Sequence, residues 1–97
     1  MRVILTPQAR AEYVEAGKWY SGQGPGLAKR LREDFRAIRS RIAAKPLYFP
    51  ATVGGARRAR LQDFPYLVIF RVVGDTVQVI AFFHMSRDPA DWQSRTQ

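Results

Sequence analysis

Four side chains in the second half of this sequence are candidates for catalysis by residue type: Arg58, Arg60, His84 and Arg87. Arginine offers a planar fork of donors that stabilises negative charge on a phosphate group during its transfer. Histidine, with an ordinary pKa of about 6.5, can donate or accept a proton near neutral pH. If the four side chains converge, RNA cleavage is a chemistry that they would support.

A structural interpretation of the same residues is also open. A lone histidine at the end of a strand is more often a hydrogen-bonding residue than a proton carrier, and the sequence places no second acid or base beside His84. The four residues are therefore catalytic candidates and not an assigned catalytic set.

The charge distribution favours an anionic partner. The chain has 16 Lys and Arg against 8 Asp and Glu, a net charge of +8, and 13 of the cations are arginine. Between residues 36 and 62 there are seven cations and no acid. A solvated surface does not require such segregation, whereas binding to an anionic surface does benefit from it.

Length and composition narrow the class of protein. A chain of 97 residues predicts one domain, residues 1–97, around one core. The absence of cysteine and the single histidine argue against a metal site, a disulfide or any cofactor. No apolar run approaches the roughly 20 residues of a membrane span, so we expect a cytoplasmic protein without membrane contact.

The first half of the chain predicts a strand and two helices. A short apolar run, residues 3–5, is followed by Thr6 and Pro7, which suit a helix cap and first turn. Apolar residues at helical spacing predict one helix from Pro7 to about Tyr20 and a second that ends before Lys45. The glycine-rich segment 21–26 between them predicts a helical hairpin.

Three strands follow, over residues 57–61, 66–73 and 76–84, with a tight turn at Gly74 and Asp75. The predicted fold class is therefore α+β: an N-terminal strand, a helical hairpin, and a three-stranded antiparallel meander that completes one twisted sheet with the helices on one face. The turn predicts four cross-strand pairs: Val73 with Thr76, Arg71 with Gln78, Ile69 with Ile80, and Leu67 with Phe82.

Strand alternation then assigns the two faces of the hairpin. The helix-covered face is predicted to carry Tyr66, Val68, Phe70, Val72, Val77, Val79, Ala81 and Phe83. The other face is predicted to be an open binding floor carrying Leu67, Ile69, Arg71, Gln78, Ile80, Phe82 and His84.

Alternation along the strand of residues 57–61 places Arg58 and Arg60 on the same face as His84. Arg71 lies near the turn, so at about 3.3 Å per residue roughly 20 Å separates it from His84, too far for a shared catalytic site. Trp92 is predicted to cover the core. Tyr13, Trp19 and Tyr20 are predicted to pack between helix and sheet.

The element order and two motifs resemble the RelE/ParE superfamily of bacterial toxins, and most closely the ParE branch, also called plasmid stabilisation proteins. The first motif is Arg58-x-Arg60-Leu61-x-x-Phe64-Pro65-Tyr66, and the second is His84-x-x-Arg87-Asp88-Pro89-x-x-Trp92. The resemblance implies a type II toxin held inactive by an acidic antitoxin that wraps the helices and the sheet. The implied surface for antitoxin or target comprises Arg58, Arg60, Arg71, His84, Arg87 and Trp92.

Two activities are known in this superfamily. RelE-like toxins cleave mRNA on the ribosome with arginines, lysines and a C-terminal tyrosine, but here no tyrosine follows Tyr66 and no lysine follows Lys45. The resemblance therefore favours a ParE-like inhibitor of DNA gyrase without a hydrolytic site. A ribosome-dependent endoribonuclease that uses His84 and Arg60 is the alternative. A nucleic-acid-binding module, suggested by net charge alone, ranks third.

Overall fold

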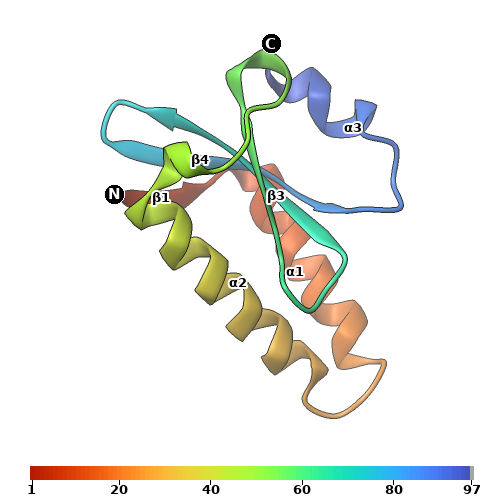
Figure 1. Ribbon diagram of the computed structural model, residues 1–97. Coiled ribbons are helices and arrows are strands. Elements are labelled where there is room, and N and C mark those ends of the chain that lie inside the picture. The colour runs from red at the N-terminus through yellow and green to blue at the C-terminus, as the bar shows by residue number, and fades with distance from the viewer. Residues whose placement is uncertain (97) are drawn as a thin grey trace.

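The computed structural model describes residues 1–96 as one four-stranded sheet with two long helices against it (Figure 1). The elements are β1 (Arg2–Leu5), α1 (Pro7–Ser21), α2 (Leu27–Ala44), β2 (Arg57–Arg60), β3 (Tyr66–Val73), β4 (Thr76–His84) and α3 (Ala90–Gln93), with single 3₁₀ turns at Pro46–Tyr48, Val53–Gly55 and Ser94–Thr96. The α+β prediction is confirmed.

The strand order in the sheet is β1-β4-β3-β2. β1 runs parallel to β4, while β3 is antiparallel to both of its neighbours. The fourth strand, β4, therefore lies inside the sheet, between β1 and β3. Within residues 1–96 no helix is both long and apolar enough to cross a bilayer.

The helical hairpin covers one face of the sheet through the predicted apolar stripes. Thr6 caps α1, since its hydroxyl oxygen accepts a hydrogen bond from the Ala9 N–H at 3.1 Å. Ala9 and Ala16 of α1 and Phe35 of α2 are buried against the sheet. The larger set of buried residues on this face includes Leu31, Ile38, Ile42, Val68, Phe70, Val77 and Val79.

A β-bulge in the β3–β4 hairpin changes which residues meet the helices. The predicted pairs of Val73 with Thr76 and of Arg71 with Gln78 are confirmed. Beyond them Phe70 pairs with Val79 and Ile69 with Ala81, so Ile80 is the extra residue. The predicted pairs of Ile69 with Ile80 and of Leu67 with Phe82 are wrong, because an inserted residue shifts every later pair by one.

This shift exchanges the two faces of the C-terminal part of β4. Phe82, predicted on the open face, packs among the helices with Tyr13 and Phe35, at ring-centroid distances of 5.3 and 5.6 Å. Ala81 and Phe83, predicted on the helix face, lie on the opposite one. Both predictions fail because a one-residue insertion inverts the alternation of inward and outward side chains.

The second face of the sheet is covered and is not the predicted open floor. The chain returns across it through α3, and Trp92, only 4% exposed, packs there in a cluster with Ile69, Ala81 and Phe83. Trp92 therefore covers an apolar cluster, as predicted, but this cluster lies on the face opposite the helical hairpin.

Asp34 fixes the loop that joins β2 to β3. It is a buried acid on α2, 8% exposed, and its two carboxylate oxygens accept hydrogen bonds from the backbone N–H groups of Gln62 and Asp63 at 3.0 and 2.7 Å. Hydrogen bonds to an ionised acceptor are stronger than neutral ones. One side chain thus holds the loop, and with it the end of the arginine-rich strand β2, against α2.

We predict that Asp34→Ala lowers the free energy of unfolding by about 1 to 3 kcal/mol, because two backbone donors lose an ionised acceptor. Glu33→Ala is the matched control, since Glu33 is an exposed neighbour on the same helix, and it should change stability by no more than about 0.5 kcal/mol. Urea denaturation of both variants measures the difference. Equal midpoints would contradict the role of Asp34.

Candidate functional site

The four catalytic candidates do not converge. Arg58 pairs with Ile69 and Arg60 with Leu67, and both of these partners pack on the second face of the sheet. His84 pairs with Tyr66, which packs against the helical hairpin. The prediction that Arg58 and Arg60 share a face with His84 is wrong, because the bulge at Ile80 moves His84 to the other face.

His84 instead lines an open groove between α1 and the end of β4, with a volume of about 520 Å³, called here the His84 groove. Its walls are formed by Gln8, Ala11, Glu12, Glu15, Ala16, Trp19, Tyr66, Phe82, His84, Arg87 and Arg95. The groove thus brings together His84 and Arg87, as predicted, but adds two acids from α1 that the sequence did not associate with them.

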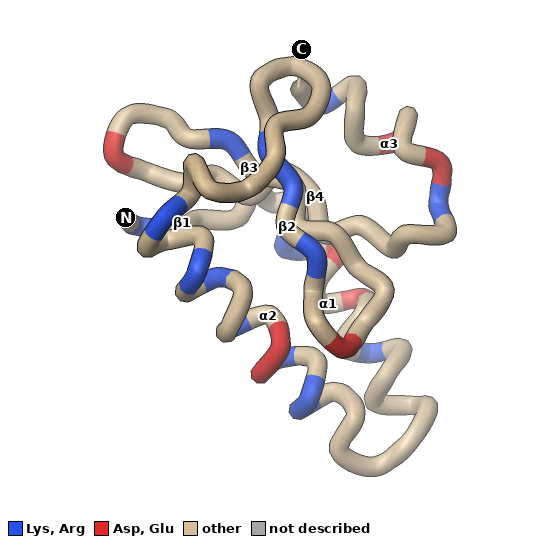
Figure 2. Tube along the Cα trace, in the orientation of Figure 1, with Lys and Arg blue, Asp and Glu red and all other residues tan. Residues whose placement is uncertain are grey.

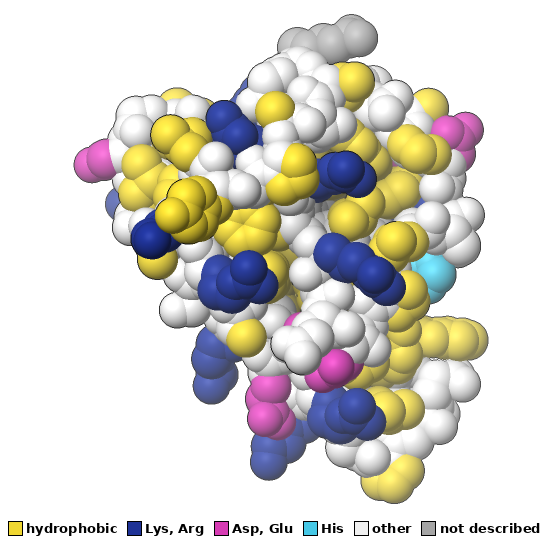
Figure 3. Space-filling model, viewed as in Figure 1, with side chains coloured by type: hydrophobic (Ala, Val, Ile, Leu, Met, Phe, Trp, Pro, Cys, Tyr) yellow, Lys and Arg dark blue, Asp and Glu magenta, His cyan; other side chains and the backbone are white. Residues whose placement is uncertain are grey.

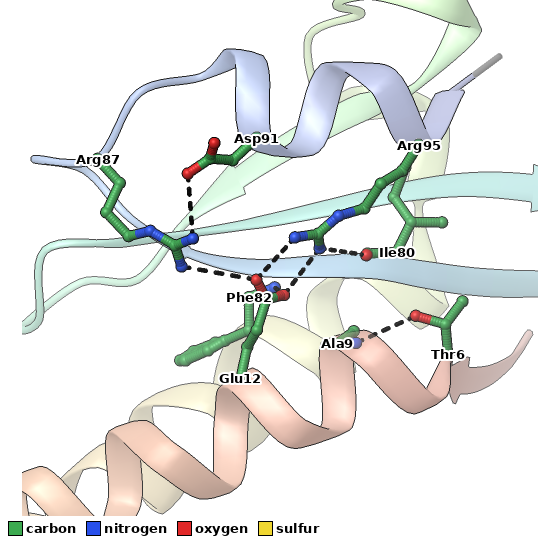
Figure 4. A network of polar contacts seen from close by, with 8 residues as sticks. All are labelled: Thr6, Ala9, Glu12, Ile80, Phe82, Arg87, Asp91 and Arg95. Atoms are coloured by element: carbon green, nitrogen blue, oxygen red, sulfur yellow. Dashed lines mark hydrogen bonds and ion pairs between the residues drawn. The ribbon is translucent and has the colours of Figure 1, made fainter.

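Glu12 is the centre of the polar contacts in this groove (Figure 4). One carboxylate oxygen accepts hydrogen bonds from the Phe82 backbone N–H at 3.1 Å and from Arg95 at 2.9 Å. The other accepts from Arg95 at 2.9 Å and lies 3.7 Å from Arg87. A single side chain therefore links α1, β4 and the C-terminal segment.

The position of Glu12 follows from the short length of β1. The pairing of β1 with β4 ends at Leu5 and Val79, so the next residues of β4 have no strand on that side. Glu12 accepts from the free N–H of Phe82, and Arg95 donates to the free carbonyl of Ile80 at 3.0 Å. The side chains thus satisfy backbone groups that would otherwise face an open sheet edge.

The contact between Glu12 and Arg95 could not be predicted from the sequence. Glu12 and Arg95 are 83 positions apart, and neither belongs to a motif. An unpaired stretch of β4 is visible only once the lengths of β1 and β4 and their register are known.

His84 and Arg87 are both engaged within the chain. The Nδ1 atom of His84 accepts a hydrogen bond from the Ser86 N–H at 3.1 Å and lies 2.7 Å from the Ser86 hydroxyl oxygen. The Arg87 guanidinium donates to Asp91 at 3.1 Å and lies 5.2 Å from the centre of the Phe83 ring. Nε2 is therefore the ring nitrogen of His84 left for an external partner, and the Arg87 charge is partly neutralised.

Tyr66 adds a phenol to the same groove. Its ring meets the His84 ring edge to face at 5.0 Å and stacks on Phe82 at 4.6 Å. Burial, with Tyr20 beside it, raises the pKa of Tyr66 above the ordinary value, while the Arg87 charge acts in the opposite direction. Tyr66 consequently stays protonated near neutral pH and is suited to donate a hydrogen bond, not to accept a proton.

The remaining predicted residues lie elsewhere. Arg71 is near the hairpin turn as predicted, and its Nε donates to Gln78 at 2.9 Å. Trp19 was expected to pack between helix and sheet, but it is 59% exposed at the rim of the His84 groove. Among residues 1–96, no group of three or more His, Cys, Asp or Glu side chains is placed to hold a metal ion.

Known proteins provide a comparison for this arrangement. A family model described as "ParE toxin of type II toxin-antitoxin system, parDE" matches residues 3–89. No curated protein sequence matches the chain. A solved structure described as "Chromosomal ParDE TA system from P. aeruginosa" is similar in fold, with a TM-score of 0.69 and 22% sequence identity over 89% of this chain and 97% of the other.

We predict that Glu12→Ala lowers the free energy of unfolding by about 2 to 3 kcal/mol, because Arg95 loses its carboxylate partner and the Phe82 N–H its acceptor. Hydrogen exchange at the Phe82 amide should accelerate as well. Glu15→Ala is the control, since Glu15 is an exposed acid of α1 that lines the same groove. If both variants are equally stable, Glu12 does not hold the C-terminal segment.

Proposed function

This chain belongs to the ParE toxin family of type II toxin–antitoxin systems, and on that premise we propose that it acts in the cytoplasm by inhibiting DNA gyrase, without catalysis of its own, until an acidic antitoxin neutralises it. The observation that carries the proposal is the family match over residues 3–89, which covers β1 from Val3 onward, the helical hairpin and the three other strands.

The separation of the cationic candidates supports a toxin without a hydrolytic site. Arg58 and Arg60 lie on one face of the sheet and His84 on the other. General acid–base catalysis needs the proton-transferring group and the charge-stabilising group around one reacting atom. Around His84 the two acids of α1 offset the charges of Arg87 and Arg95, so the groove lacks the net positive charge that would hold a phosphate group, which favours a protein target over RNA cleavage.

The surface charge supports an acidic antitoxin. Cationic residues are distributed along α2 and β2; β2 carries no acid, and α2 carries only Glu33 and Asp34 (Figure 2). Arg58 and Arg60 are exposed on β2, a strand at the edge of the sheet. An acidic chain laid along this edge would meet both guanidinium groups, and complementary charge accelerates association and aligns the partners.

We predict that the purified protein inhibits supercoiling by DNA gyrase and that its production in cells induces the SOS response, because a gyrase poison leaves DNA damage. Supercoiling assays and a reporter strain measure the two effects. The competing endoribonuclease function predicts rapid translation arrest with ribosome-dependent mRNA cleavage that His84→Ala abolishes. That result, with gyrase unaffected, would refute the proposal.

We predict that Arg60→Glu weakens binding of the antitoxin by about tenfold or more, since it replaces an attractive charge at the edge strand by a repulsive one. The melting temperature should hardly change because Arg60 is exposed. Arg10→Glu is the control, an exposed arginine on α1 changed by the same charge. Titration calorimetry with the purified antitoxin measures the affinity of both variants. Unfolding of Arg60→Glu would show a structural role instead.

A further inference from the structure

A second exposed surface lies at the C-terminal end of α2, away from the His84 groove. It is formed by Met1, Arg41, Lys45, Leu47, Tyr48 and Val72 and is called here the Tyr48 patch. Tyr48 is 79% exposed and Leu47 68%, the highest exposed fractions among the large apolar side chains of residues 1–96, and Met1 is 51% exposed. Hydrophobic side chains gather here beside Lys and Arg (Figure 3).

The exposed side chains are held in place by buried neighbours. Pro46, before them, is buried, and the Phe49 ring, after them, packs edge to face on Phe70 at 5.8 Å. Arg57 donates to the Phe49 carbonyl oxygen at 2.8 Å. Leu47 and Tyr48 therefore project from a fixed 3₁₀ turn, so a partner that binds them does not have to order the segment.

Tyr48 separates two hollows. One, of about 330 Å³, is lined by Arg41, Lys45 and Phe49, and the other, of about 470 Å³, by Met1, Leu47 and Val72. The second hollow also includes Lys45 and Tyr48, but the rest of its walls are aliphatic and suit aliphatic side chains of a protein.

The charge around both hollows is positive. Lys45 Nζ lies 4.7 Å from the centre of the Tyr48 ring, and the Arg41 guanidinium lies 5.5 Å from that of Phe49. Among residues 1–96 no acidic side chain lines either hollow, and the patch is centred in the acid-free stretch of residues 36–62. A negatively charged partner would thus meet cations without a competing carboxylate of this chain.

We propose that the Tyr48 patch is a docking site for an acidic protein segment that places aliphatic side chains in the two hollows and carboxylates against Arg41 and Lys45. A second copy of this chain is disfavoured because two cationic patches repel each other. A nucleic acid is disfavoured because Lys45 lies over one ring face of Tyr48, which leaves one face for base stacking, and among residues 1–96 the larger hollow has no aromatic side chain besides Tyr48.

The proposal is independent of whether gyrase is the target. It requires only an acidic, aliphatic-rich segment, and it assigns that segment to a surface that does not include His84, Arg87 or the arginines of β2.

A short fluorescein-labelled peptide of leucine and glutamate, tested by fluorescence anisotropy against the full-length protein, is the probe. We expect Tyr48→Ala and Lys45→Glu each to weaken binding by about tenfold or more, as for an aromatic anchor and its charged neighbour. The matched controls Trp19→Ala, an exposed aromatic residue on α1, and Arg10→Glu should bind as the unaltered protein does.

Further probes distinguish an acidic protein segment from other possible occupants of the Tyr48 patch. Polyglutamate without leucine and oligothymidylate should bind at least about tenfold more weakly than the peptide, and amide shifts on peptide titration should map to residues 41–49. Equal binding of polyglutamate would indicate charge alone, and tighter binding of oligothymidylate would indicate a nucleic-acid surface. Loss of binding in Trp19→Ala but not in Tyr48→Ala would indicate the His84 groove. Each of these three results overturns the proposal.

Discussion

The single extra residue in β4 is the constraint on which the two-sided packing of this protein depends. Ile80 has no direct partner on β3, and the strand beyond it is turned over relative to a regular hairpin. Phe82 is thereby directed into the aromatic core between sheet and helices, while Phe83 is directed to the face covered by Trp92. Both faces of the C-terminal part of β4 are consequently buried, and His84 emerges beside α1.

The shortness of β1 is a second constraint on the structure. β1 pairs only with the first residues of β4, so the last residues of β4 have no strand on that side. Glu12 and Arg95, from elements distant in sequence, bind the backbone groups along this edge. The same contacts bind the C-terminal segment across the sheet. The contacts that protect this edge of β4 are therefore also the contacts that attach the C-terminal segment. They close the edge to strands from other molecules.

Much of the fold could be predicted from local chemistry. Thr6 and Pro7 begin a helix, glycines end it, and Gly74 with Asp75 sets the first pairs of the hairpin. The bulge could not be predicted because Val79 to Phe83 are all apolar, so no polar residue marks which side faces solvent. That ambiguity also misplaced the candidate site, since the face of His84 depends on the register beyond Ile80. The contact of Glu12 with Arg95 depends on tertiary structure alone.

The place of β4 in the sheet has a consequence for synthesis of the protein. Of the four strands in residues 1–96, β4 is the last in sequence, yet it lies between β1 and β3 and is the only strand that pairs with β1. β1 thus has no strand to pair with until residues 76–79 have left the ribosome, and contacts that span most of the sequence form slowly. A growing chain accordingly presents neither the finished sheet nor its surfaces until β4 has been made.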